Sequence, residues 1–164
     1  MTNIRSGSLA PKFSLKAVEG QQYSLESLVA GGPVLVAFFK VSCPVCQFTF
    51  PFLQRIADRF AGKNVCVIGV SQDDARNTSE FNQEFGVKFP VLLDEKGYPA
   101  SNAYGLTNVP TIFLIGTDGK VKVSCTGFDK AALEQIVGEL EQQQNITAAP
   151  LFLAKENVPA YKPG

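Results

Sequence analysis

Four short stretches of the chain are apolar at nearly every position. They span residues 34–39, 65–70, 89–93 and 111–115. Uninterrupted apolar runs of strand length are typical of strands that are buried on both faces of a sheet. Residues 121–125 alternate between apolar and polar instead, and the turn 116–119 predicts that they pair with 111–115 as a hairpin.

A helical pattern follows the first of these predicted strands. Apolar residues recur every three or four positions from Pro44 to about residue 60, which predicts a helix with one buried stripe. Proline suits the first turn of a helix, whereas Pro51 removes a hydrogen bond further along and predicts a kink. The expected stripe consists of Val45, Phe48, Phe52, Ile56 and Phe60.

Three more helices are expected later in the chain, over residues 77–85, 98–104 and 130–140. The last has Asp129 as its N-cap, and its apolar stripe is Leu133, Ile136, Val137 and Leu140. At the other end of the chain, residues 12–15 and 21–25 flank the turn 18–21 and predict a short hairpin. One helical turn over residues 24–29 follows it.

Strands and helices therefore alternate over most of the sequence. This order predicts an α/β fold, a three-layer α/β/α sandwich with a mixed central sheet and an N-terminal hairpin extension. We expect one domain over residues 1–144. Residues 145–164 contain three prolines and no clear period, so they are expected to form an extended tail that Leu151, Phe152 and Leu153 attach to the domain.

Composition removes several classes of function. Fifteen basic and fifteen acidic residues balance, so no net field favours nucleic acid or anionic lipid. The chain has no histidine, which excludes Ser-His-Asp and Cys-His catalysis and every histidine-ligated metal site. Neither a signal peptide nor an apolar run of membrane-spanning length is visible, and a cytoplasmic location is the default expectation.

Two cysteines, Cys43 and Cys46, stand between the first predicted strand and the helix that follows it. At a helix N-terminus, unpaired N–H groups and the helix dipole favour a thiolate over a thiol. Such positions and Cys-x-x-Cys spacing lower a cysteine pKa from about 8.5 to about 3.5–7.5. Because the thiolate is the nucleophile of disulfide exchange, this pair is a candidate redox-active centre.

The other two cysteines complete the set of soft ligands in the chain. A four-cysteine zinc site usually contains a second close pair, whereas Cys66 and Cys125 lie in separate predicted strands. Cys66 is expected to pack in the core as a small hydrophobic residue. Cys125 lies close to Gly127 near the end of its strand, where core packing is expected and an additional redox role is the alternative.

From about residue 8 to residue 140 the chain resembles the thioredoxin superfamily, and within it the redoxin branch. That branch includes TlpA-like thiol-disulfide oxidoreductases and the alkyl hydroperoxide reductase and thiol-specific antioxidant peroxiredoxins. Four features in order carry the resemblance: the opening 10–15, Cys43-Pro44-Val45-Cys46 between strand and helix, Pro51 five residues later, and Val109-Pro110-Thr111 before an apolar strand.

The resemblance implies a role for each site residue. Cys43 would attack and Cys46 would resolve the mixed disulfide. Pro110 would be a cis proline beside the disulfide and, with Val109 and Pro44, would contact the substrate. The resemblance implies no metal or organic cofactor. The partners would be a protein or small-molecule disulfide and a thiol electron donor; the substrate, the donor, the redox potential and the oligomeric state stay open.

Some positions depart from the pattern of the better-known relatives. Ser42 stands where thioredoxins usually have tryptophan, and Ala37 and Gly69 stand where they have a buried carboxylate and a buried lysine. Thr49 stands where some TlpA-like reductases have an acid. Lys40 is the nearest cation in sequence and would lower the pKa of Cys43 if its amine turned inward; a solvated lysine at a strand end is the alternative.

Two rival functions remain beside the oxidoreductase. A thiol-dependent peroxidase of the peroxiredoxin type would use a proline, a threonine and an arginine near its cysteine. If Cys46 were that cysteine, the corresponding positions would hold Phe39, Cys43 and Pro110, which lack those groups. A non-catalytic binding module with the same fold is the second rival. The sequence favours a thiol-disulfide oxidoreductase.

Overall fold

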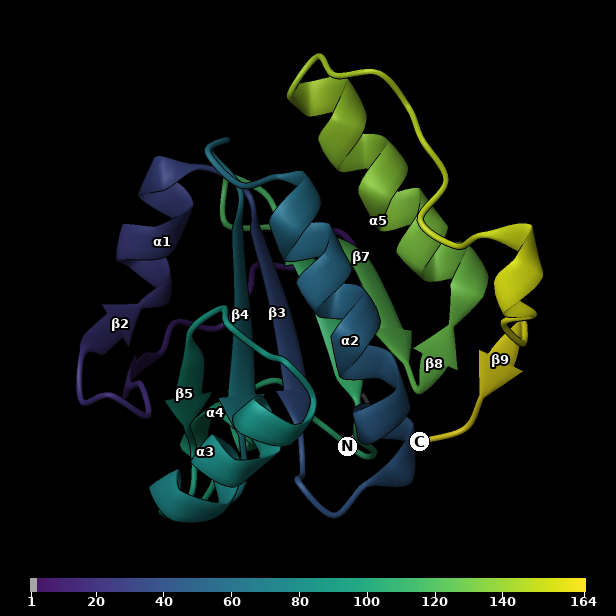
Figure 1. Cartoon of the computed structure of the whole chain (residues 1–164). Helices are drawn as coiled ribbons and strands as arrows, with labels where there is room; N and C mark the ends of the chain where they lie inside the picture. The colour runs from purple at the N-terminus through teal and green to yellow at the C-terminus, as the bar shows by residue number, and fades with distance from the viewer. Residues whose placement is uncertain (1–2) are drawn as a thin grey trace.

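A mixed five-stranded sheet forms the centre of the molecule in a computed structural model that describes residues 3–164. Its strands follow the order β5-β4-β3-β6-β7 (Figure 1). Strands β3 (Val34–Phe39), β4 (Cys66–Ser71) and β5 (Val91–Leu93) run parallel. Strand β6 (Thr111–Ile115) is antiparallel to β3, and strand β7 (Val121–Thr126) is antiparallel to β6. The predicted α/β fold with a mixed sheet is confirmed.

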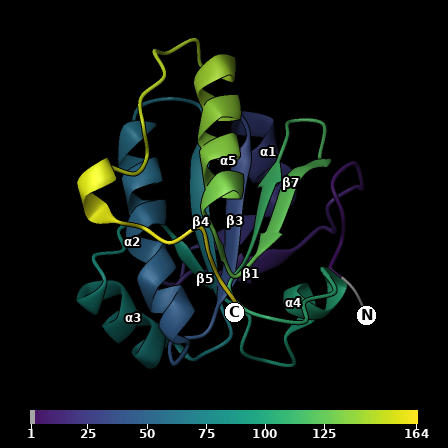
Figure 2. The same cartoon turned by 90° about the vertical axis from the view of Figure 1, so that its right-hand side faces the viewer.

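The central strand β3 divides the apolar core into two clusters, because alternate side chains point to opposite faces of the sheet. Leu35, Ala37 and Phe39 face the side covered by α2 (Pro44–Arg59), α3 (Ala75–Glu84) and α5 (Lys130–Gln143). Val34, Val36 and Phe38 face the side covered by α1 (Leu25–Gly31), α4 (Pro99–Ala103) and the N-terminal hairpin. All six residues of β3 are fully buried, as its uninterrupted apolar run predicts. The helices on either side of the sheet are visible when Figures 1 and 2 are compared.

The N-terminal hairpin is confirmed, with β1 (Ser14–Lys16) antiparallel to β2 (Gln22–Ser24). Two isolated bridges attach the N-terminal segment to the sheet. Ala17 bridges Leu92 of the edge strand β5, and Leu9 bridges Lys120 beside the other edge strand β7. The segment therefore protects both edges of the sheet, whose unpaired backbone groups would otherwise be open to other chains.

Helix α2 is buried over a broader face than its spacing predicts. Val45 and Phe48 of the expected stripe are only half-buried, and Phe50 and Leu53, which the prediction omitted, are fully buried. The reason is that α2 packs against α3 as well as the sheet. The Phe50 ring lies 4.2 Å from the Phe39 ring and 5.5 Å from the Phe81 ring of α3, measured between centroids. The helix continues through Pro51.

Residues 145–164 form a tail that returns from the far end of α5 toward the start of α2 (Figures 1 and 2). The tail includes a 3-10 turn, η1 (Ala154–Glu156), and a short strand, β9 (Tyr161–Lys162), which pairs antiparallel with β8 (Phe128–Asp129). Leu151 and Phe152 are buried in the core beside α2 and α5, whereas Leu153 is 47% exposed. Two of the three side chains expected to attach the tail therefore do so.

No helix described over residues 3–164 has the length and apolar content needed to cross a membrane.

Candidate active site at the start of helix α2

The carboxyl end of β3 leads through a short loop to Cys43, the N-cap residue of α2. The Sγ atom of Cys43 accepts a hydrogen bond from the backbone N–H of Cys46 at 3.2 Å. The Cys43 carbonyl accepts the N–H of Gln47 at 3.0 Å and begins the helix. Pro44 occupies the first turn, where an N–H group would have no partner in the helix. The sulfur of Cys43 thus takes the place of a capping oxygen.

The second thiol of the pair has a different environment. Cys46 is fully buried, and Cys43 is only partly buried; both are free thiols. Burial raises the pKa of Cys46 far above its ordinary value, and its hydrogen bond with Cys43 adds to that rise. A backbone hydrogen bond at Lys40 acts in the opposite direction with a smaller effect. The site therefore contains one accessible thiol at a helix N-terminus and one thiol that stays protonated in the core.

Aromatic side chains fill the space where better-known relatives hold buried charges. Ala37 pairs with Gly69 across β3 and β4, and Ala37 belongs to the same apolar cluster as Cys46. A methyl group added to Gly69 would lie 3.3 Å from Phe39 and from Phe50, so no longer side chain fits there without displacing a ring. Alanine at position 37 and glycine at position 69 therefore leave the space that the phenylalanine rings occupy. The core next to this pair is apolar.

Thr49, at the position compared above with the acid of some TlpA-like reductases, supplies no carboxylate. Its side chain is fully buried and donates its hydroxyl proton to the Val45 carbonyl oxygen at 2.7 Å. The Thr49 hydroxyl therefore makes its hydrogen bond within its own helix. Thr49 therefore supports the first turns of α2 and leaves Cys46 without a carboxylate on the same helix face.

The loop before β6 lies against the attacking thiol. The Val109–Pro110 peptide bond is cis, as the resemblance implies. The Cys43 thiol donates to the Val109 carbonyl oxygen at an Sγ–O distance of 3.6 Å. On the other side of the loop, the N–H of Gly127 donates to the Pro110 carbonyl at 2.8 Å. Because β6 is the neighbour of β3 in the sheet, residues 66 positions apart meet at the same end.

The residues that hold the loop in front of Cys43 were not predicted from the sequence. The Val41 N–H donates to the Asp73 carboxylate at 2.8 Å, and the Val41 carbonyl accepts from the Gln47 amide at 2.9 Å. The charge of Asp73 also contributes to the raised pKa of Cys46, as the smallest of its causes. Asp73 follows the carboxyl end of β4, the parallel neighbour of β3. That topology is the signal that could have identified it.

The remaining predicted residues lie around this centre or away from it. Pro44 and Lys40 are exposed, Val109 is half-buried and Pro110 is buried. Burial raises the pKa of Cys66 to about 11 and that of Cys125 to about 12, where the charge of Asp129 adds to the effect. Over residues 3–164, no group of three or more His, Cys, Asp or Glu side chains is arranged to hold a metal ion.

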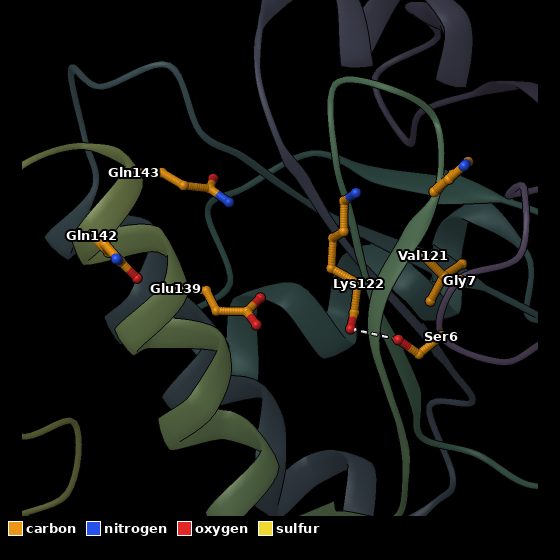
Figure 3. Close-up of a pocket in the computed structure, with 8 residues that line it drawn as sticks. Ser6, Gly7, Val121, Lys122, Glu139, Gln142 and Gln143 are labelled. Atoms are coloured by element: carbon orange, nitrogen blue, oxygen red, sulfur yellow. Dashed lines mark hydrogen bonds between the residues drawn. The ribbon is translucent and has the colours of Figure 1, made fainter.

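One surface hollow of the molecule lies away from the dithiol. It measures about 400 Å³ and lies between the β6–β7 turn and the last turns of α5 (Figure 3). Lys120 and Lys122 come from one wall and Glu139, Gln142 and Gln143 from the other. The residues that line this hollow include no thiol, so the Cys43–Cys46 pair at the start of α2 is the candidate centre for redox chemistry.

Comparison with known proteins places the chain in a family. Residues 6–124 match the model of the AhpC/TSA family. The chain is 32% identical over 142 residues to the thiol-disulfide oxidoreductase ResA of Bacillus thuringiensis, which covers 86% of this chain and 75% of that protein.

Two solved structures are similar in fold. A thiol:disulfide interchange protein of Chlorobium tepidum has a TM-score of 0.69 and 28% identity, over 84% of this chain and 98% of its own. The peroxidoxin BcpB of Mycobacterium tuberculosis has a TM-score of 0.73 over 85% of this chain and 97% of its own, but at 23% identity it indicates the fold alone. The chain belongs to the AhpC/TSA family and is a thiol-disulfide oxidoreductase with the Cys43–Cys46 pair.

Proposed function

We propose that this member of the AhpC/TSA family reduces protein disulfides, with Cys43 as the nucleophile and Cys46 as the resolving cysteine. The Cys43 thiolate attacks one sulfur of the substrate disulfide. A Cys43–substrate disulfide forms, and the other substrate sulfur leaves as a thiolate and takes up a proton. Cys46 then loses its proton and attacks Cys43 Sγ, which releases the second substrate thiol. Two electrons pass to the substrate, and a thiol donor returns the pair to the dithiol.

The observation that carries this assignment is the difference between the two thiols. Cys43 is partly exposed and its sulfur accepts the Cys46 N–H at the start of α2, an arrangement that stabilises negative charge on sulfur. Cys46 is fully buried and burial raises its pKa, so it is a poor first nucleophile. Once a mixed disulfide exists, Cys46 is one helical turn away from the sulfur that it must attack.

The surroundings of Cys43 support a peptide substrate. Val109 presents its carbonyl oxygen beside the thiol, and Pro110 and the exposed Pro44 flank it. Backbone groups at such an edge pair with an extended chain through main-chain hydrogen bonds. We propose these three residues as the substrate contacts. The Lys40 side chain is exposed, and an effect of its charge on Cys43 stays a prediction.

Trapping of the mixed disulfide tests the assignment. The Cys46→Ser variant, in its reduced form, should accumulate a covalent adduct with disulfide-bonded insulin or another disulfide substrate, because no resolving thiol remains. The matched Cys43→Ser variant should form none. In the wild-type chain, oxidation should remove about 2 Da and map to a Cys43–Cys46 bridge. Equal trapping by both variants would contradict the assigned roles.

A peroxidase assay separates this function from its main rival. Cleavage of an O–O bond requires donors placed where charge develops on oxygen. The positions that correspond to the peroxiredoxin donors hold Phe39, which is fully buried, Cys43 and Pro110. We expect insulin reduction with dithiothreitol to proceed and peroxide consumption to stay below about 10⁴ M⁻¹s⁻¹, the lower edge of ordinary enzyme efficiency. Faster peroxide turnover without insulin reduction would replace our proposal.

A further inference from the structure

The end of the tail crosses the same end of the sheet as the dithiol. We call residues 158–164 the strap. Its strand β9 pairs with β8, with Tyr161 opposite Asp129 and Lys162 opposite Phe128. The Ala160 carbonyl accepts the Lys130 N–H at 3.0 Å. In Figure 1 the end of the described chain, marked C, stands beside the first turns of α2.

The last residue of the strap lies on the cis-proline loop. A methyl group added to Gly164 would overlap the carbonyl oxygen of Val109, so the Gly164 backbone is in van der Waals contact with that carbonyl. The same oxygen accepts the Cys43 thiol. A methyl group added to Gly127 would overlap the Lys162 carbonyl oxygen, and Gly127 is bonded to Pro110. The strap therefore contacts the loop at Val109 and also lies against Gly127, which is hydrogen-bonded to Pro110.

The contacts of the strap are few compared with those of the core. The Lys162 ammonium lies 4.8 Å from the centre of the Phe48 ring on α2, and Val158 packs against the core. The other five residues of the strap are exposed, including Tyr161 at 54%. A two-residue strand with exposed neighbours opens at a low free-energy cost, because little apolar area leaves the core.

We propose that the strap occupies the peptide-binding edge at Val109 and makes the site selective against extended protein substrates until they displace it. The strap approaches this edge as a short extended segment, which is the form that a substrate peptide would take there. A peptide and the strap then compete for one surface. This inference rests on the proposed function, because it concerns access to Cys43 by its substrate.

Small disulfides and protein disulfides should respond differently to the strap. A small disulfide needs only the partly exposed Cys43 sulfur and meets no competition from the strap. A protein segment needs the Val109 edge as well. Its apparent affinity is therefore the intrinsic affinity multiplied by the fraction of molecules in which the strap is lifted. Substitutions that lift the strap should therefore change the rate with proteins and not the rate with small disulfides.

Kinetics of variants of the 164-residue chain test this separation. In Gly164→Val the side chain cannot fit over the Val109 carbonyl, and the strap end must move. We expect kcat/KM for insulin to rise about tenfold, which corresponds to about 1.4 kcal/mol, and kcat/KM for hydroxyethyl disulfide to stay within about twofold. The control Leu153→Ala, on the exposed side of the tail, should match the wild type with both substrates. Equal changes with both substrates, or no gain with insulin, would overturn the proposal.

Hydrogen exchange gives a second test that does not depend on the fold of a Gly164 variant. Mixed disulfides of Cys46→Ser are prepared with a cysteine-containing peptide and with mercaptoethanol. The strap amides, which exclude Pro159 and Pro163, should lose protection in the peptide adduct and keep it in the mercaptoethanol adduct. Unchanged protection in the peptide adduct would refute the strap as a competitor. Failure to form either adduct would instead refute the proposed function, so the two failures are distinct.

Discussion

The body of the molecule, up to the end of α5, and its tail, residues 145–164, are held by different means. The body is a layered structure in which β3 is buried on both faces and each helix covers the sheet with a stripe or a broad apolar face. The tail has only a 3-10 turn and a two-residue strand. The AhpC/TSA match ends at residue 124, so the tail lies outside the part that the family model describes.

The tail is attached by two arginines of α2 and by two apolar side chains. Arg55 donates to the Leu151 carbonyl and to both carboxylate oxygens of Glu156, each at 2.9 Å. The Arg59 guanidinium donates hydrogen bonds to the Glu141 carboxylate of α5 and to the Thr147 carbonyl oxygen. The Phe152 ring lies 4.9 Å from the Phe52 ring. The body therefore supplies the chemistry, and α2, the helix that carries the dithiol, is also the helix that holds the tail.

Removal of the whole tail should give the largest effect on stability. We propose that residues 1–144 fold as a domain without it, and deletion after Gln144 tests this. The deletion exposes the pockets of Leu151 and Phe152, and burial of each such side chain is worth about 1.5–3 kcal/mol, so a loss of about 3–6 kcal/mol in unfolding free energy is expected. Urea unfolding followed by circular dichroism measures the loss. A truncated chain without a cooperative transition would show that the tail belongs to the domain.

The same phenylalanine-to-alanine substitution can be made in each region, so that the two losses of stability are directly comparable. Phe50→Ala in the body should lower the unfolding free energy by about 4–5 kcal/mol, because Phe50 is fully buried and its removal leaves a closed cavity. Phe152→Ala in the tail should cost about 3 kcal/mol, since its site lies at the margin of the core and can relax. Leu153→Ala is the control and should stay within about 0.5 kcal/mol of the wild type. Equal losses for the two phenylalanines would mean that the tail is packed as tightly as the body.

Buried thiols should make the body sensitive to alkali. Burial raises the pKa of Cys125 from 9.0 to about 12, so the unfolded chain releases this proton first. The contribution of the protonated thiol is complete below pH 9 and is lost as the pH rises from 9 toward 12. The slope approaches about 1.4 kcal/mol per pH unit within that window. Cys125→Ala should show a shallower decline than the wild type in unfolding free energies measured from pH 8 to pH 10.5, and parallel curves would contradict the assignment.

Much of the body could be predicted because its signals are periodic. The apolar runs identify β3 and β6 to the residue, and Asp129 caps α5 as its position predicts. Cys43 and Cys46 were predicted from their spacing at a helix start, and Pro110 was predicted from the resemblance alone. Phe50 was missed because contact with α3 is a tertiary feature that a single helical stripe does not contain. Asp73 was missed because its role depends on which strands are neighbours, and not on its own sequence context.

The course of the tail could not be predicted for a related reason. Leu151 and Phe152 are adjacent apolar residues, which suggest attachment but not a place of attachment. Their place is set by a gap between α2 and α5 that exists only after the body folds. The contact of Gly164 with Val109 depends in turn on the pairing of β9 with β8. No local pattern in residues 158–164 indicates the dithiol.

The tail should respond to acid, and this is the smallest effect expected. The hydrogen bond with Arg55 is the main cause that lowers the pKa of Glu156 from 4.5 to about 2, and the Leu153 N–H adds to it. A carboxylate with a lowered pKa stabilises the fold above pH 4.5, and this stabilisation is lost as the pH falls from 4.5 toward 2. Solvent screens the pair, since Arg55 is 43% exposed, so the effect is modest. Glu156→Gln should therefore be slightly less stable than the wild type at pH 7 and indistinguishable from it near pH 2. The melting temperatures of the two proteins across this range measure the difference, and a constant offset would mean that the Arg55–Glu156 pair does not hold the tail.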